Sequence, residues 1–522
     1  MTMLRRAKRS LMAFCVAFAE AATLLMPLAS CKDPASYARL GVDASLAGLD
    51  AQKRARVRQI TIRSRPENAT DSQSTYQVTV TPADLDQSFA YHLDYVPATQ
   101  KGAFVVSVSL ASETSEQLAI RSERVVLAPG KTVRAELDFV SEVTTAGSCI
   151  PEADAVDVSD TAGGSKSFTL LWDEDHYLYV YEDLTYGKGD LVSQKLDAWG
   201  RRLSAPMIIN SSPRVSTLPS LAKIDGGFVV AWQEGDSLDI PVAVELRHLD
   251  HDGAPVGNIR TVATYANESR PQILPAFGKL AMTWIDHRMP NDDTEHLALV
   301  AFLDPSNLSF TSDKPIALTP PGATKSADAF PGLSLIDSTL VASWVSDGHT
   351  VYTTRLSDKL EMQTPEMVYS SEFTAQQLWV ISAGDRFFTT WEDLSGDLEI
   401  GRERIRSAYT NVDGTLGAGD WVTEPVDGSA NWPRAAYDGH GSVAVVFYQY
   451  RDFGSQIYLQ RFTPDGQKLD EPEVQITDVL GQAKYPNIQL TGSDESGDHF
   501  AIGWVSDHTG LPRVYLQPFV CQ

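Results

Sequence analysis

The sequence predicts an all-β protein, in which a small antiparallel β-sandwich is followed by a seven-bladed β-propeller. Three observations lead to this fold class. Apolar and polar residues alternate in short runs, as they do in half-buried strands. An aromatic residue followed by acids or turn residues recurs seven times between residues 181 and 507. Glycines occur at corresponding positions in several of these copies, where a turn needs a positive φ.

Residues 1–30 have the features of a secretion signal. The first ten residues contain four bases and no acid, and a mostly apolar stretch, interrupted by Glu20, continues to Pro27. Small residues then precede a cysteine in Leu28-Ala29-Ser30-Cys31. A basic start, an apolar centre and small residues at the cut site are typical of a signal peptide.

The Leu-Ala-Ser-Cys31 sequence resembles the lipobox of bacterial extracytoplasmic lipoproteins. The resemblance implies cleavage before Cys31, acylation of its thiol with lipid such as palmitate, and membrane anchoring, which several acyl chains make stable. Lys32 after the cysteine implies sorting to the outer membrane of a Gram-negative cell envelope. An uncleaved N-terminal anchor, or a chance cysteine after an ordinary signal, is the alternative.

After the signal we expect a tether over residues 31–50, a sandwich over 51–145 and the propeller over 146–522. In the sandwich, Tyr76, Val78 and Val80 share one strand face, and a second alternating run begins at Phe104. Several such runs separated by Pro, Gly and Ser/Asn clusters indicate a small antiparallel sandwich. Without a cluster of reactive residues, this domain is expected to be a spacer.

The repeat that defines the propeller is seen in its aromatic residues. They are Tyr181, Trp232, Trp284, Trp344, Trp391, Phe447 and Trp504, at intervals of 51, 52, 60, 47, 56 and 57 residues. This period fits blades of four short strands. A proline precedes the aromatic in most copies and is expected to begin strand A; these are Pro219, Pro271, Pro331, Pro433 and Pro486. Turn glycines between strands C and D are expected at Gly200, Gly253 and Gly466.

The last copy ends before its fourth strand. Strand C is expected over 513–519, and the chain stops at Gln522, whereas residues 152–159 resemble a strand D. The N-terminal strand is therefore expected to complete blade seven and leave no open sheet edge. Because Cys15 leaves with the signal and Cys31 is lipidated, Cys149 and Cys521 remain, and in an oxidising compartment they are expected to form a disulfide across this closure.

Charge excludes one class of partner. The chain has a formal net charge of −25, and residues 150–522 hold 26 bases and 53 acids, whereas residues 51–149 hold 11 of each. This step supports two domains. A surface this acidic does not suit nucleic acid, whose phosphates need a basic face.

Acids follow the aromatic residue in the copies, at the expected start of the loops between strands B and C. They are Glu182, Asp183, Glu234, Asp286, Asp347, Glu392, Asp393, Asp452 and Asp507. One interpretation is an acidic ring at the channel mouth that binds a cation or a basic partner. We favour turn capping after a buried aromatic residue, because a feature found in all seven blades indicates a fold signature.

Two of these loops differ from the rest and give candidates for a binding face. The candidates are Asp286, His287, Arg288, Asp393, Asp397 and Asp507. Asp393, Ser395 and Asp397 alternate as in a calcium loop but lack its later bidentate Glu. We therefore expect no cofactor and no metal, with calcium as the alternative.

The propeller repeats loosely resemble those of bacterial TolB-like and sialidase-like propellers, in architecture only. The sialidase Asp-box is absent, and Arg402, Arg404 and Arg406 alternate on one strand face, as expected of a solvated outer strand. We therefore expect a lipid-anchored, non-enzymatic module that binds a protein or glycan. The alternative is a carbohydrate-active enzyme with a site in the channel mouth, which would need two placed carboxylates.

Overall fold

The computed structural model describes part of the chain. Before residue 139 it describes seven strands and residues 57–58, and after residue 148 it describes residues 149–521, except for gaps at 160, 186–188, 238–239, 265–269, 288–295, 313, 319–328, 371–373, 398–401, 424–427, 452–453, 471, 480 and 495–496. The signal segment and Cys31 lie outside the described residues. Within them, no helix is long and apolar enough to cross a membrane.

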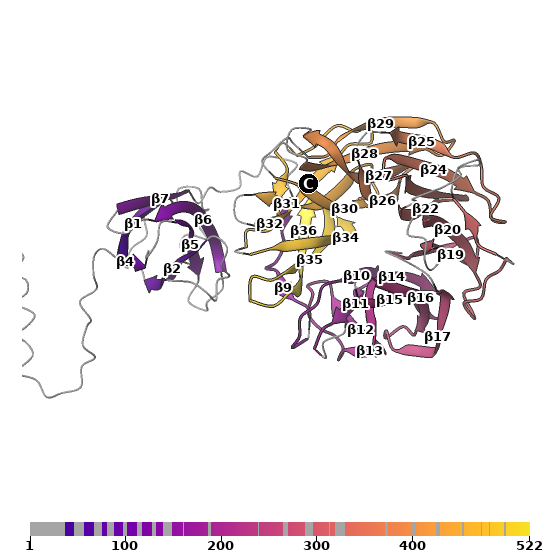
Figure 1. Ribbon diagram of the computed structural model, residues 1–522, viewed down its shortest axis with the longest axis horizontal. Helices are drawn as coiled ribbons and strands as arrows, with labels where there is room; N and C mark the ends of the chain where they lie inside the picture. The colour runs from indigo at the N-terminus through magenta and orange to yellow at the C-terminus, as the bar shows by residue number, and fades with distance from the viewer. Residues whose placement is uncertain are drawn as a thin grey trace, which may run out of the picture.

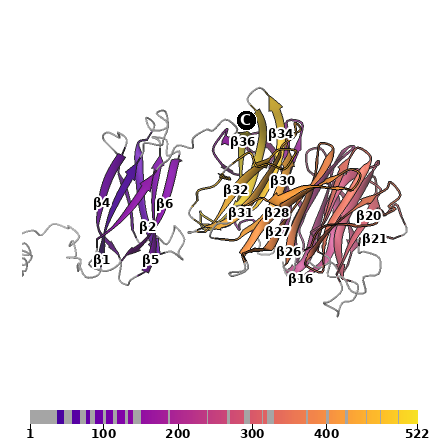
Figure 2. The same cartoon turned by 90° about the horizontal axis from the view of Figure 1, so that it is seen from above.

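Residues 149–521 form seven sheets arranged in a ring, which confirms the seven-bladed β-propeller (Figure 1). Blades 1 to 6 run in chain order from an inner strand A to an outer strand D, and in blade 7 the outer strand comes from the start of the propeller. The inner strands contact one another around the ring, and the first, β10, contacts the last, β34. Viewed at right angles to Figure 1, the strands run roughly along the ring axis (Figure 2). All regular elements in the described residues are strands.

The first four blades have four strands each. They are β10 (Phe168–Asp173), β11 (His176–Asp183), β12 (Asp190–Asp197) and β13 (Met207–Asn210); β14 (Val215–Ile224), β15 (Gly227–Ser237), β16 (Ile240–Leu249) and β17 (Pro255–Ala263); β18 (Gln272–Ala276), β19 (Lys279–His287), β20 (His296–Leu303) and β21 (Ile316–Ala317); and β22 (Ala329–Ile336), β23 (Thr339–Ser346), β24 (Thr350–Leu356) and β25 (Glu366–Ser370).

Blades 5 to 7 complete the ring. They are β26 (Ala375–Ala383), β27 (Arg386–Asp397), β28 (Arg402–Asn411) and β29 (Leu416–Trp421); β30 (Ala430–Tyr437), β31 (Val443–Arg451), β32 (Gly454–Phe462) and β33 (Val474–Gln475); and β34 (Ala483–Asp494), β35 (Gly497–Ser506) and β36 (Arg513–Cys521), with β8 (Cys149–Pro151) and β9 (Val156–Asp157) paired to β36.

The repeated aromatic residues join neighbouring blades. All seven lie in strand B and are at most 2% exposed. Trp232 packs with Leu178 and Val180 of the preceding blade, and Trp284 packs with Val229 and other apolar residues of blade 2. Because truncation of such a buried side chain to alanine costs about 3–5 kcal/mol, this position holds each pair of blades together.

The ring closes as the sequence predicts. In β36, Cys521 lies opposite Cys149 of β8 and is joined to it by a disulfide that spans 372 positions of the chain. The closing strand is in two short pieces, β8 and β9, instead of one continuous strand. The turn glycines Gly200, Gly253 and Gly466 have φ of +77°, +83° and +85°, as a tight C–D turn requires.

The repeated prolines differ from the prediction in one respect. Pro271 lies just before β18, but Pro219, Pro331, Pro433 and Pro486 lie inside strand A, where the pairing with strand B is irregular. Proline has no N–H to donate to the ladder, so a bulge tolerates it better than a regular strand position. Strand A therefore begins several residues before these prolines, and each proline marks a bulge.

Before the propeller, seven strands form two sheets. They are β1 (Tyr37–Ser45), β2 (Gln59–Pro66), β3 (Tyr76–Val80), β4 (Ser88–Pro97), β5 (Gly102–Ala111), β6 (Gln117–Leu127) and β7 (Thr132–Asp138), in the orders β4-β1-β7 and β3-β2-β5-β6. Strand β1 lies within the expected tether and pairs in parallel with β7. The packing of these sheets as a sandwich, and the domain boundaries, stay predictions.

Candidate functional site

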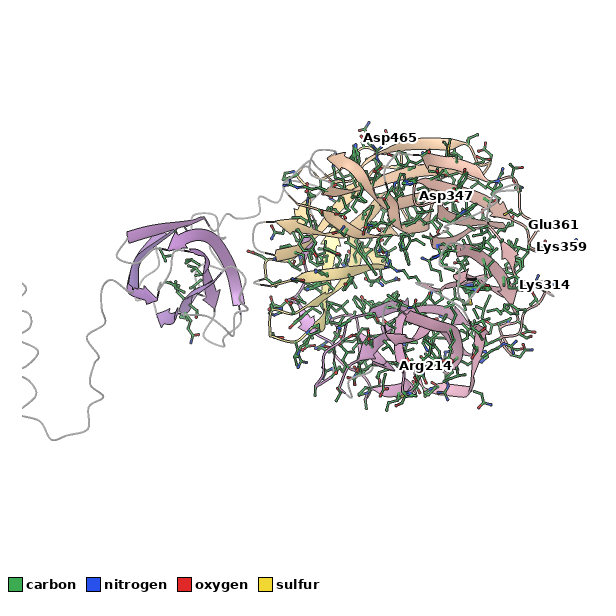
Figure 3. The ribbon with its side chains drawn as sticks, viewed as in Figure 1. Arg214, Lys314, Asp347, Lys359, Glu361 and Asp465 are labelled. Carbon is green, nitrogen blue, oxygen red and sulfur yellow. A yellow bond between two sulfur atoms is a disulfide. The ribbon has the colours of Figure 1, made fainter. Side chains whose placement is uncertain are left out.

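A pocket of about 350 Å³ lies at the centre of the ring, where the inner strands meet. Side chains of the inner strands project into this central space (Figure 3). The lining residues come from six of the seven blades and, except for Gln233, from strand A or the segment just before it. They are Lys166, Ser167, Phe168, Thr169, Thr217, Leu218, Pro219, Ser220, Gln233, Arg270, Pro271, Gln272, Trp379, Trp432, Arg434, Tyr485, Pro486 and Asn487.

The bulges of strand A shape this pocket. Leu218, Arg270, Trp432 and Tyr485 each precede a repeated proline, and their φ values are +53°, +34°, +56° and +54°. A non-glycine residue in this left-handed region costs about 1–2 kcal/mol, and such strain is concentrated at functional sites. All four residues line the pocket, so the strained backbone directs a side chain from four different blades toward one cavity.

Side chains of the preceding blade stabilise two of these bulges. The N–H of Trp432 donates to Oε1 of Glu392 at 2.6 Å. The N–H of Leu218 donates to Oγ of Ser167 at 3.2 Å, and that hydroxyl donates to Oε2 of Glu182 at 3.1 Å. Because an unpaired buried N–H costs about 1–3 kcal/mol, these contacts hold the bulged backbone in place.

Two arginines share one indole ring in the pocket wall. The guanidinium carbons of Arg270 and Arg434 lie 4.3 and 5.1 Å from the ring centroid of Trp432. Arg270 also lies 4.8 Å from the ring of Phe330, and Arg434 lies 4.4 Å from the ring of Trp379. Cation–π contacts of this kind fix the planes of the guanidinium groups. The two cations therefore lie against the same aromatic ring, and the charge of the buried Glu392 acts on both.

The pocket is positively charged although the propeller is acidic. Burial, followed by the charge of Arg270, lowers the pKa of Arg434 to about 9, so this group is still cationic at neutral pH. Lys166 is exposed and lines the same pocket. Among the described lining residues there is no aspartate or glutamate. The chemistry of the wall therefore suits an anion.

Two buried glutamates lie behind this wall, at equivalent positions directly after the aromatic residues of blades 1 and 5. Burial raises the pKa of Glu182 to about 7, against the hydrogen bonds from Ser167 and Thr217. Burial likewise raises the pKa of Glu392 to about 7, opposed by the N–H of Trp432 and the charge of Arg270. Neither glutamate is a lining residue, so each acts on the pocket through the residues it contacts.

The candidate binding residues from the sequence do not gather at this pocket. Asp286 and His287 end strand β19, where they lie opposite Leu297 and His296, and Arg288 lies outside the described residues. Asp507 lies in a B–C turn and accepts the N–H of Gln482 at 2.8 Å.

Asp393 is fully buried, and its Oδ2 lies 2.8 Å from Nε of Arg406. Its carboxylate therefore serves an ion pair. The backbone of Asp397 lies opposite Arg402 in the blade 5 hairpin, and its side chain is outside the described residues. In the part of the chain that the structure describes, no group of three or more His, Cys, Asp or Glu side chains is placed to hold a metal ion.

The repeated acids divide into two kinds. Glu182, Glu234, Glu392 and Asp393 lie inside strand B and are at most 3% exposed. Oε2 of Glu234, for example, accepts from Nε1 of Trp232 at 3.1 Å. Glu182, Glu234 and Glu392 accept internal hydrogen bonds, and Asp393 forms an ion pair with Arg406, so none of the four caps a solvated turn. Only the later members, such as Asp347 and Asp507, lie in the turns between strands B and C.

Arg270 and Arg434 were not predicted from the sequence. The signal that could have found them is the repeated proline, because the residue before it lines the channel in four blades. Arg404 and Arg406, in contrast, lie 4.1 and 3.7 Å from the ring of Trp421 on the outer strands of blade 5. Other charged side chains, among them Lys314, Lys359 and Glu361, lie at the outer edge of the ring (Figure 3).

Comparison with known proteins gives similarity of fold only. No protein family and no curated protein matches the chain. An ulvan lyase has a TM-score of 0.42 and 10% identity, over 70% of this chain and 92% of that chain. A neuraminidase-like protein of subtype N10 from A/little yellow-shouldered bat/Guatemala/060/2010 has a TM-score of 0.40 and 5% identity, over 59% and 94%. A GH43 endo-arabinanase from Bacillus licheniformis has a TM-score of 0.30 and 12% identity, over 48% and 96%.

Proposed function

We propose that the propeller is a non-enzymatic module that binds a carboxylated sugar of a glycan in its central pocket. The observation that carries this proposal is the pair of Arg270 and Arg434 in a wall whose described residues include no carboxylate. Guanidinium groups bind carboxylates through two parallel hydrogen bonds. A uronic acid carries one carboxylate on a single pyranose ring.

The electrostatics of the pair support an anionic ligand. Burial, followed by repulsion from the charge of Arg270, lowers the pKa of Arg434. A bound anion would remove this repulsion. Since the ligand would be partly shielded from water, each charge-assisted hydrogen bond would contribute more to the binding free energy than it does on an exposed surface.

The size and the rings of the pocket support a sugar over a protein side chain. A volume of about 350 Å³ lies at the lower end of the range for small-molecule sites. Phe168, Trp379, Trp432 and Tyr485 contribute aromatic surface, on which the apolar C–H face of a pyranose ring can stack. Gln233, Gln272 and Asn487 supply amide groups for its hydroxyls.

We also propose that the chain is anchored to the outer membrane through lipid on Cys31. The lipobox-like sequence before Cys31 and the basic start of the chain support this anchor. The seven strands that precede the propeller would then act as a spacer in a sandwich. The Cys149–Cys521 disulfide agrees with an oxidising, extracytoplasmic compartment.

A carbohydrate-active enzyme is the second candidate, and one observation favours it. Glu182 and Glu392 both have a pKa near 7, which suits acid–base catalysis at neutral pH. However, both lie behind the lining residues instead of among them. Incubation with polyuronates and measurement of new reducing or unsaturated ends distinguishes the candidates: turnover that Glu392→Gln abolishes would establish the enzyme.

Binding is tested by calorimetry on the full chain in detergent, with galacturonic and glucuronic acids against galactose and glucose. We expect at least one acid to bind ten or more times as tightly as its neutral counterpart. Arg434→Ala and Arg434→Lys should remove this preference. Arg355→Ala is the matched control, because Arg355 lies in blade 4 beside Glu366, away from the pocket. Equal binding of acids and neutral sugars, or binding of neither, would refute the proposal.

A further inference from the structure

A row of aromatic rings leads from the pocket to the surface across blades 6 and 7. The ring centroids of Trp432 and Tyr485 are 4.8 Å apart, those of Tyr485 and Tyr448 are 6.1 Å apart, and those of Tyr448 and Tyr450 are 5.8 Å apart. Trp432 and Tyr485 line the pocket. Tyr448 is 9% exposed, whereas Tyr450 is 37% exposed. Tyr448 is part of the core between blades 6 and 7, and Tyr485 packs against that core, so buried rings connect the cavity wall to the exposed ring of Tyr450.

Tyr450 is held on a rigid part of the fold. It lies on β31, two residues after Tyr448, so both side chains project to the same face of the strand. Its N–H donates to the carbonyl of Ser429 at 2.9 Å, in the segment that leads into β30. A Cβ on Gly428, whose φ is +137°, would lie 1.5 Å from the carbonyl oxygen of Tyr450. Only glycine allows this close approach of the two segments.

A cation accompanies the exposed ring. The ammonium of Lys484 lies 5.1 Å from the ring centroid of Tyr450 and 5.9 Å from that of Tyr448. Lys484 directly precedes Tyr485 in β34, so one strand supplies both a ring of the pocket wall and a charge at the surface. Lys484 thus places a cation beside the exposed ring of Tyr450, whereas Arg270, Arg434 and Lys166 lie at the pocket itself.

Among the described residues, Trp199 is a second exposed aromatic residue, but its setting is different. Trp199 is 42% exposed and lies in the turn between β12 and β13, on the outer side of blade 1. Its N–H donates to Asp197 at 2.9 Å, as turn residues do. It has no place in the row of rings that reaches the pocket. Trp199 therefore serves as a control for exposed aromatic surface alone.

We propose that Tyr450 and Lys484 form a second subsite, which holds the sugar next to the one in the pocket. The ligand would then be an acidic oligosaccharide or polysaccharide rather than a single sugar. This inference rests on the proposed function, because the pocket must take the first acidic sugar. Tyr450 would stack on the neighbouring ring, and Lys484 would pair with its carboxylate.

The test compares chain lengths. Trigalacturonic acid and triglucuronic acid are titrated into the full chain alongside their monomers, with Tyr450→Ala, Lys484→Met and the control Trp199→Ala. In the wild type we expect a trimer to bind about ten times as tightly as its monomer. Tyr450→Ala should reduce this ratio to about one, and Lys484→Met should reduce it several-fold, while monomer binding is unchanged and reports an intact pocket. Trp199→Ala should change neither affinity.

Three results would overturn the second subsite. The first is a wild-type trimer that binds no more tightly than its monomer, and the second is a Tyr450→Ala variant that keeps the full chain-length effect. The third is an equal loss of monomer and trimer binding in Tyr450→Ala, which would make the ring a support of the pocket. In all three cases the wild type still binds the monomer, so none of them contradicts the proposed function. Binding of neither probe to the wild type would refute both proposals.

Discussion

Replacing Glu182 by glutamine is expected to stabilise the propeller at pH 8 and to leave its stability nearly unchanged at pH 4. Burial raises the pKa of Glu182 from its ordinary value of 4.5 to about 7. Between these values the unfolded chain loses a proton that the folded chain retains, so stability falls as the pH rises. Below pH 4.5 both states are protonated and the cost is absent. Above pH 7 the cost is complete.

The magnitude follows from this difference. A rise of the pKa from 4.5 to about 7 corresponds to about 3 kcal/mol. Glutamine has nearly the same shape, and its carbonyl can accept from Ser167 or Thr217, which now donate to Oε2 of Glu182 at 3.1 and 3.2 Å. Loss of one of these hydrogen bonds would return about 1 kcal/mol. The expected net gain at pH 8 is therefore about 2–3 kcal/mol.

Thermal unfolding of the full chain at pH 4 and pH 8, followed by calorimetry or near-ultraviolet circular dichroism, measures the effect. For a domain of roughly 370 residues, the unfolding entropy makes this gain equal to a rise in Tm of about 3 °C. Glu361→Gln is the control, because Glu361 is exposed, and no such dependence on pH is expected. The same shift at both pH values, or a lower Tm at pH 8, would show that burial does not hold Glu182 protonated.

Three further predictions follow from other parts of the chain. Cys149→Ser is expected to lower the free energy of unfolding of the ring by up to about 5 kcal/mol, because the disulfide closes a loop of 372 positions. Denaturant unfolding measures this loss, and unchanged stability would show that strand pairing alone closes the ring. Cys31→Ser should move the protein from the membrane to the soluble fraction, and retention in membranes would instead indicate an uncleaved anchor. Hydrogen bonds that His499 donates to Glu152 and Asp494 raise the pKa of His499. Its contribution to stability is therefore present below its ordinary pKa and disappears as the pH rises through the raised value. His499→Gln should therefore lower Tm more at pH 5.5 than at pH 9, and an equal loss at both would exclude the charged form.

The fold could be predicted from the sequence where one repeated residue has one structural role. The buried aromatic of strand B occurs seven times because every pair of neighbouring blades needs the same filling. The closing strand and the Cys149–Cys521 pair were predictable for a related reason: a ring has one place where its first and last strands meet. Strand β1 was not predicted, because Leu40, Val42 and Ala44 form only a short alternation of apolar residues. In the structure this short strand is stabilised by its pairing with β4 and β7.

The candidate site was not predictable in the same way. Arg270 and Arg434 are far apart in the sequence and belong to blades 3 and 6, and only the closure of the ring brings both to the ring of Trp432. The acids were expected in solvated turns because their spacing matches that of turn residues, but spacing does not reveal whether a side chain is exposed. Glu182 and Glu392 fit the repeat as turn residues do, yet both are buried and hold bulges.

These buried acids connect the stability of the propeller with its pocket. Glu392 accepts the N–H of Trp432, the ring of Trp432 contacts Arg270 and Arg434, and both cations face the same cavity. Each residue in this series is held in an unfavourable state. Glu392 is a buried carboxyl with a raised pKa, Trp432 has a left-handed backbone, and the two arginines are neighbouring cations. By comparison, the cluster around Trp284 between blades 2 and 3 consists of apolar residues. An anion bound to the arginines would stabilise the cations directly, and it would raise the cost of ionising Glu392 further. Ligand affinity should therefore be linked to the protonation of a residue that the ligand does not touch.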